Sequence, residues 1–150
     1  MPYRVRTRGV EVMSLEQVRL SGYSISRILA VPYEEAVERA RAALALEGFG
    51  VLCEIDVRDK LREKLGVDFR RYVILGACNP TLAHRALQTE IELGLFLPCN
   101  VIVYESDDGQ GSVVAAVDAN AMLGAVGDNP ALAEVASEVS RLLERVIDSL

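Results

Sequence analysis

The sequence has few of the residues on which metal sites and disulfide scaffolds depend. It contains no tryptophan, one histidine (His84) and three cysteines among 150 residues. A single histidine excludes a histidine-rich metal site within one chain. An odd number of widely spaced cysteines does not describe a disulfide framework, so we expect free thiols in a reducing cytoplasm.

Long apolar runs and an excess of positive charge are also missing. The longest apolar stretches, YVILGAC and LFLPCNVIVY, are the length of a strand and fall short of the ~18 residues that cross a bilayer. The first residues hold arginines but no apolar core of the ~7–15 residues that a signal peptide needs. A net charge of −6 argues against nucleic-acid binding, because an acidic chain repels phosphate. We therefore expect a cytoplasmic protein that binds neither membrane nor nucleic acid.

The remaining composition, 51% apolar and 25% charged residues, suits one folded domain, since domains typically hold roughly 100–150 residues. Residues 1–22 stand apart from it. Arg4, Arg6 and Arg8 alternate there with less polar residues, which is the period of a strand with a basic face. The pattern predicts an N-terminal arm or an added edge strand before a single α+β domain at residues 23–150.

Within that domain the apolar spacing alternates between strand and helix periods. Asn79-Pro80 and Asn129-Pro130 are typical helix starts, with asparagine as the cap and proline in the first turn. The loop DDGQG between two alternating runs predicts a hairpin. The predicted strands are 23–31, 49–56, 72–78, 99–106 and 112–118, and the predicted helices are 32–47, 57–65, 80–95 and 130–150.

The resulting order is β-α-β-(short α)-β-α-β-β-α, which contains a split βαβ arrangement. It predicts a mostly antiparallel sheet with helices packed on one face. We expect the helix after Pro80 to cross the sheet, with Ile91 and Leu95 on its buried side. Strands that are apolar on both faces imply that the free face is covered, and a second copy is the simplest cover. We therefore predict a homodimer.

Two stretches, ILGACNP at residues 74–80 and LPCNVIVYE at residues 97–105, resemble the signatures of a bacterial and archaeal family, the domain-of-unknown-function family three-zero-two. EGFGVLCEID, the KLG at residues 64–66 and the hairpin extend the resemblance over residues 24–150. It implies a fold like the TATA-binding-protein sheet and a dimer. It implies no activity and no catalytic residue.

The Cys-Asn pairs inside these stretches are candidate ligand-binding residues. Cys78 and Asn79 lie at a helix start, where the dipole can lower a thiol pKa and where anions bind. The alternatives are a buried cysteine and an asparagine that only caps the helix. Cys99 and Asn100 repeat the dipeptide, but a helix of ~22 Å crossing the sheet would separate the two corners.

Glu54 and Asp56 are the remaining candidates. They lie two residues apart on one strand, so both point away from the face that carries Cys53. Such a pair can hold a hard cation, or it can be an ordinary solvated strand end.

The sequence thus predicts a dimeric module that binds a small ligand or a partner, with Glu54, Asp56, Cys78, Asn79, Cys99 and Asn100 as candidate residues. No catalytic set, metal site or cofactor motif is predicted. The alternatives are a thiol-dependent enzyme or redox protein that uses Cys78, and metal binding across a dimer.

Overall fold

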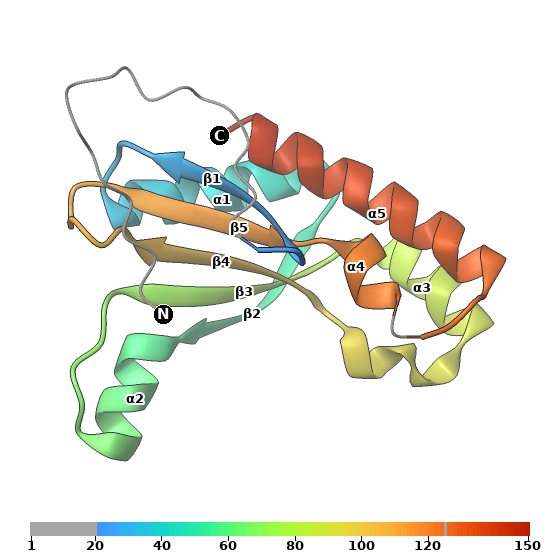
Figure 1. Cartoon of the computed structure of the whole chain (residues 1–150), viewed down its shortest axis with the longest axis horizontal. Helices are drawn as coiled ribbons and strands as arrows, with labels where there is room; N and C mark the ends of the chain where they lie inside the picture. Colours follow the sequence, from blue (N-terminus) through green and yellow to red (C-terminus); the bar gives the residue numbers. More distant parts are fainter. Residues whose placement is uncertain (1–20, 125) are drawn as a thin grey trace.

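A computed structural model describes residues 21–124 and 126–150, and in these ranges it shows an α+β fold (Figure 1). Five strands form one antiparallel sheet in the order β1-β5-β4-β3-β2. Their bounds are β1 (Ser24–Leu29), β2 (Gly50–Asp56), β3 (Tyr72–Cys78), β4 (Cys99–Glu105) and β5 (Ser112–Val117). The predicted fold class is therefore confirmed, while the predicted arm at residues 1–22 lies almost wholly outside the described residues.

The helices follow the signals in the sequence at most of their starts. Asn79 and Asn129 cap two of them, each with proline in the first turn, as predicted. The helices are α1 (Tyr33–Leu46), α2 (Val57–Leu65), α3 (Pro80–Thr89), α4 (Ala119–Leu123) and α5 (Pro130–Asp148), with a 3₁₀ helix, η1 (Ile91–Phe96), after α3. Within the described ranges, no helix has both the length and the apolar character needed to cross a bilayer.

The core lies between the sheet and two helices: α1 contacts β4 and β5, and α5 contacts β1 and β5. Ile25, Leu75 and Val101 on the strands and Leu44 and Leu143 on the helices are fully buried. The DDGQG loop forms the predicted hairpin between β4 and β5, where Gly109 takes a positive φ of 69°. Pairing within the sheet fixes the end of β3 beside the start of β4.

The expected crossing of the sheet after Pro80 is wrong. α3 ends at Thr89, Glu90 becomes extended, and its side chain caps η1 by accepting a hydrogen bond from the Glu92 backbone N–H. The chain thereby turns back to the end of the sheet it left, and β4 runs antiparallel beside β3. Ile91 and Leu95, expected on a buried stripe, are 78% and 84% exposed.

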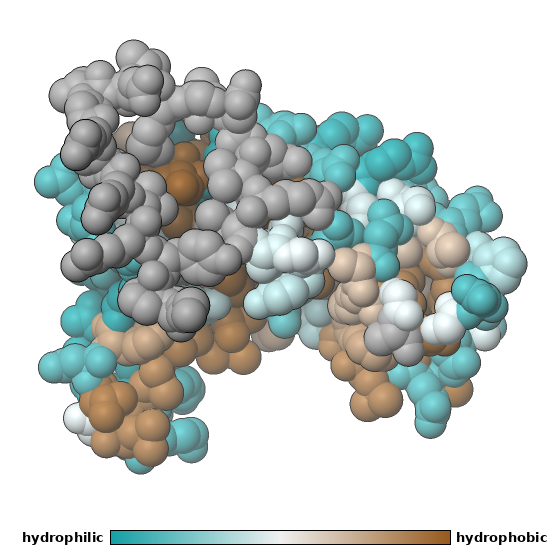
Figure 2. Space-filling view, in the orientation of Figure 1, coloured by the Kyte–Doolittle hydropathy of each residue, from teal (hydrophilic) through white to brown (hydrophobic). Residues whose placement is uncertain are grey.

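The surface reflects this folding back. In Figure 2 apolar residues gather below the sheet, around α2 at one side and around η1 at the other. The opposite side of the molecule, along α5, is mainly polar in the same view.

Candidate functional site

The two Cys-Asn corners lie side by side within one chain. Ala77 is the register partner of Cys99, and Gly76 is the partner of Asn100, so the end of β3 adjoins the start of β4. The predicted separation of the corners is therefore wrong, for the reason already seen in α3 and η1. Because the corners adjoin, distance does not exclude a joint role for the two thiols, and their chemistry depends on their surroundings.

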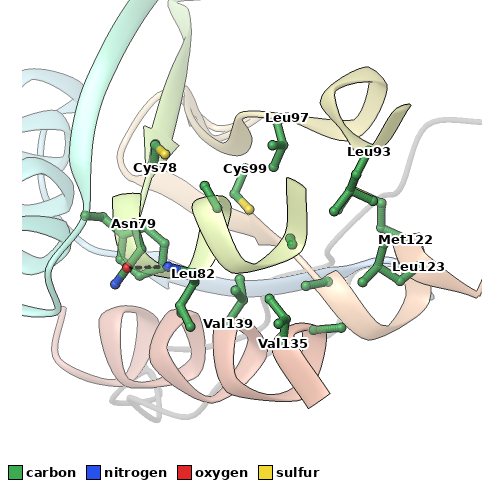
Figure 3. A pocket seen from close by; sticks show the side chains of 16 residues that line it. Cys78, Asn79, Leu82, Leu93, Leu97, Cys99, Met122, Leu123, Val135 and Val139 are labelled. Carbon is green, nitrogen blue, oxygen red and sulfur yellow. Dashed lines mark hydrogen bonds between the residues drawn. The ribbon is translucent and has the colours of Figure 1, made fainter. Parts of the chain in front are cut away.

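Those surroundings form an apolar cavity between the sheet end and helices α3, η1, α4 and α5 (Figure 3). Its volume is about 40 Å³, which exceeds the roughly 10–15 Å³ that one water molecule needs. Cys78, Asn79 and Cys99 lie in its wall together with leucine, valine, alanine, methionine and phenylalanine side chains. In Figure 3, Leu93, Met122 and Leu123 form the end of the cavity farthest from Asn79.

Burial sets the chemistry of the two thiols. Cys99 is 8% exposed, and desolvation, followed by the neighbouring Cys78, raises its pKa from 9.0 to about 11. Burial also raises the pKa of the half-buried Cys78 thiol. Of the two interpretations of Cys78, a thiol with a lowered pKa at the helix start and a buried cysteine, the raised pKa agrees with the second. Both sulfurs are therefore thiols at neutral pH.

Asn79 and Asn100 have different positions. The Asn79 side-chain oxygen accepts a hydrogen bond from the Leu82 backbone N–H at 3.2 Å, so this residue caps α3 and also lines the cavity. Asn100 is exposed opposite Gly76 and is not among the lining residues. Of the four corner residues, the structure brings Cys78, Asn79 and Cys99 to one cavity and leaves Asn100 outside.

Cys53 and Gly76 are packed closely together near the same corner of the sheet. They are register partners, and a Cβ atom on Gly76 would lie 2.4 Å from the Cys53 sulfur and 2.8 Å from Cγ of Pro98. Glycine is therefore required here by close approach of its neighbours. The contact fixes β2, β3 and the segment before β4 against one another.

Glu54 and Asp56 do not act as a pair. Glu54 forms an ion pair with Arg41 of α1, whereas Asp56 caps α2 by accepting a hydrogen bond from the Asp59 backbone N–H at 3.0 Å. Asp56 also borders a polar cavity of about 400 Å³ with Tyr33, Arg58 and Arg71. No cluster of three histidine, cysteine or acidic side chains suited to a metal occurs in the described residues.

His84 is exposed on α3 and does not line the apolar cavity, so a pairing with Cys78 has no support from their positions. The reasoning from sequence missed Leu93, Met122 and Val135, which come from three separate segments. Nothing in the spacing of these residues distinguishes them from core positions. Asp118 does signal the missed helix α4, because its side chain accepts hydrogen bonds from the Asn120 and Ala121 backbone N–H groups.

A five-stranded antiparallel sheet layered by helices, with an apolar cavity at one corner, defines the chain as an α+β protein. Comparison with known proteins gives the family. The model of the family described as "Domain of unknown function DUF302" matches residues 25–150, and the chain belongs to this family. The resemblance seen in the sequence is thereby confirmed.

A solved structure supports the same assignment. The chain is similar to the uncharacterised conserved DUF302 protein from Bacillus stearothermophilus, whose crystal structure aligns with a TM-score of 0.78 at 34% sequence identity. The alignment covers 86% of this chain and 98% of the other. No curated protein matches the chain significantly.

Proposed function

We propose that this protein is a binding module that takes a small apolar group into the cavity at the β3–β4 corner. The observation that carries the proposal is the composition of the cavity wall. Among the lining residues the polar atoms belong to two protonated thiols and to Asn79, whose oxygen is engaged by Leu82. A water molecule needs two to four polar partners, so the space favours a hydrocarbon group over water.

The size and wall of the cavity suggest the chemical class of the ligand. About 40 Å³ accepts the end of an alkyl chain, with further depth available if the flexible Met122 side chain moves. The two thiols are compatible with an apolar ligand, since a protonated thiol behaves as a small hydrophobic group. A thiol-dependent reaction is less well supported, because it requires a thiolate and both pKa values are raised.

The test is a titration with n-alkanols from butanol to octanol, followed by NMR of ¹³C-methyl-labelled methionine. Met122 is a direct reporter because it lines the cavity, and a Met122→Leu variant assigns its signal. We expect a saturable shift of the Met122 methyl signal. An Ala136→Leu variant, which places a larger side chain in the wall, is expected to abolish the shift.

The control is Ala42→Leu, which adds the same atoms at an exposed position of α1 and is expected to leave the titration unchanged. A Met122 signal that does not move at any alkanol concentration would contradict the proposed function. A shift that survives Ala136→Leu would also contradict it, because the alkanol would then be bound elsewhere.

We also propose that the module works as a homodimer in a reducing cytoplasm, with its three thiols free. The support is an uncovered apolar edge on the described chain and an odd number of cysteines. Titration of the unfolded protein with a thiol reagent is expected to give three thiols per chain without a reductant, and one thiol per chain would indicate a disulfide instead.

A further inference from the structure

Exposed apolar side chains gather along one edge of the molecule. Eight of the ten large apolar side chains that are exposed in residues 21–124 and 126–150 belong to β2, to α2 with residues 66–71, and to η1. Leu65 and Leu95 are 68% and 84% exposed, and Ile55 of β2 is 44% exposed. Figure 2 shows this apolar surface on both sides of the hollow below the sheet. Clustering of this kind marks an interaction surface.

The strand in the middle of this edge is open to pairing. β2 is the last strand of the sheet, and within the described chain it pairs only with β3. Edge strands usually carry charges that keep other chains away. Here Glu54 forms an ion pair with Arg41, and Asp56 accepts a hydrogen bond at the start of α2. Both carboxylates are therefore already paired within the chain and repel an approaching strand less strongly.

The two apolar segments lie at opposite ends of β2. α2 follows directly from Asp56 at one end. η1 precedes Cys99, and the register Gly50–Cys78 and Ala77–Cys99 places it at the other end, as Figure 1 shows. A two-fold axis at the middle of β2 reverses the strand. It therefore brings α2 of one copy to η1 of the other, twice in the same dimer.

The charges of these segments are complementary. α2 carries four basic residues and two acidic ones, Asp59 and Glu63. The segment from Glu90 to Leu97 carries Glu90 and Glu92 and no basic residue. Opposite potentials across an interface favour association and fix its orientation. A second copy in the two-fold arrangement satisfies both the apolar and the charge requirement.

We propose that the β2 edge is the interface between two copies of this chain, with α2 of each copy packed against η1 of the other. This inference rests on the proposed homodimer and specifies its surface. Leu93 of η1 and Leu97, which directly follows η1, also line the apolar cavity. In the dimer, α2 of the partner therefore lies against the outside of the cavity wall.

The test uses charge reversal on the full chain, with dimer dissociation constants from analytical ultracentrifugation at low salt. One variant carries Lys60→Glu and Lys64→Glu on α2, and the other carries Glu92→Lys on η1. Each alone is expected to weaken its dimer at least tenfold. Lys60→Glu with Lys64→Glu makes the net charge of α2 negative, so it faces the acidic η1 segment, whereas Glu92→Lys leaves that segment with Glu90 as its one acidic residue and no net charge to attract α2. In an equimolar mixture one contact of the heterodimer is that of the wild type, and the other joins the acidic α2 to the η1 that carries Glu92→Lys, so its dissociation constant is expected to return to within threefold of the wild type.

Two further variants sharpen the result. Leu95→Glu changes a side chain that is 84% exposed, so the monomer is expected to fold normally while dimerisation is lost. Arg141→Glu, on the exposed face of α5, is the matched control and is expected to leave the dissociation constant unchanged.

The outcomes separate the interface from the homodimer itself. A wild-type chain that is monomeric at every concentration would overturn both and assign the edge to a different partner. A wild-type dimer that neither charge reversal nor Leu95→Glu affects would overturn this interface alone, because the two copies would then meet through another surface. Recovery in the mixture supports the two-fold pairing of α2 with η1.

Discussion

Replacing Gly76 with alanine tests the packing that holds the corner of the sheet together. The added Cβ would lie 2.4 Å from the Cys53 sulfur and 2.8 Å from Cγ of Pro98. Ordinary contacts between such atoms are ~3.5–4.0 Å, so both overlaps are severe. The sulfur can rotate away because Cys53 is exposed, whereas the proline ring has little freedom. Overpacking of this kind costs about 1–3 kcal/mol of the free energy of unfolding.

The free energy of unfolding is measured by urea denaturation. The comparison is valid where each variant has the same m value as the wild type. Cys53→Ala alone is expected to cost less than about 1 kcal/mol, since surface changes are small. Combined with Gly76→Ala it removes the nearer overlap. The double variant is therefore expected to be more stable than the sum of the single effects by about 0.5–1 kcal/mol or more.

Gly22→Ala, away from the proposed interface, is the matched control, because a Cβ there meets nothing within 4 Å. It is expected to be neutral or to stabilise the protein by up to about 1 kcal/mol. A neutral Gly76→Ala variant, or strict additivity with Cys53→Ala, would refute the register of β2, β3 and β4 that brings Cys78 and Cys99 together.

Three further predictions concern the cap, the buried thiol and a buried arginine. Asn79→Ala removes the hydrogen bond to the Leu82 backbone N–H and is expected to cost about 1 kcal/mol in urea denaturation, with Asn79→Asp retaining most of the stability. Because the Cys99 pKa is raised from 9.0 to about 11, the folded chain keeps a proton that the unfolded chain loses, so about 2–3 kcal/mol of stability present below pH 9 is lost between pH 9 and 11. A Cys99→Ala variant should lack this part of the pH dependence, and equal slopes for the two proteins would contradict the burial of the thiol. Arg27, 6% exposed, donates hydrogen bonds to the Ile147 and Asp148 carbonyl oxygens at the end of α5, and Arg27→Met is expected to cost about 1–3 kcal/mol and to increase hydrogen exchange in the last turn of that helix.

Much of the fold could be predicted because its signals are local. Asn79-Pro80 and Asn129-Pro130 each supply a cap and a first-turn proline, and both helices begin there. The DDGQG loop combines glycine at a positive φ with alternating strands on each side, and it forms the expected hairpin. Such features depend on a few neighbouring residues, so the rest of the molecule does not need to be known.

The course of the chain after Pro80 could not be predicted from periodicity. Ile91 and Leu95 continue the helical spacing of Leu82 and Ala86, although the helix stops at Thr89. The break depends on Glu90 becoming extended and capping η1, which no apolar pattern reveals. The error then placed the two Cys-Asn corners far apart, and this led to the wrong argument against their proximity.

The cavity could not be predicted from the sequence, because its wall is assembled from segments that lie far apart along the chain. Its wall combines Phe49, the corner residues 77–79, and side chains from α3, η1, α4 and α5. Each of these looks like an ordinary core residue in its own segment. Only the positions of Cys78, Asn79 and Cys99 were predicted, because the corner residues stand at element boundaries.

A crystal structure determined under xenon pressure tests the apolar cavity most directly. Xenon binds in dry apolar cavities and has no hydrogen-bonding requirement. We predict a xenon site within the wall formed by Leu82, Cys99 and Val135, and we predict its loss in the Ala136→Leu variant. Ordered water in this space, or the absence of xenon there, would contradict the assignment of the corner as a receptor for an apolar group.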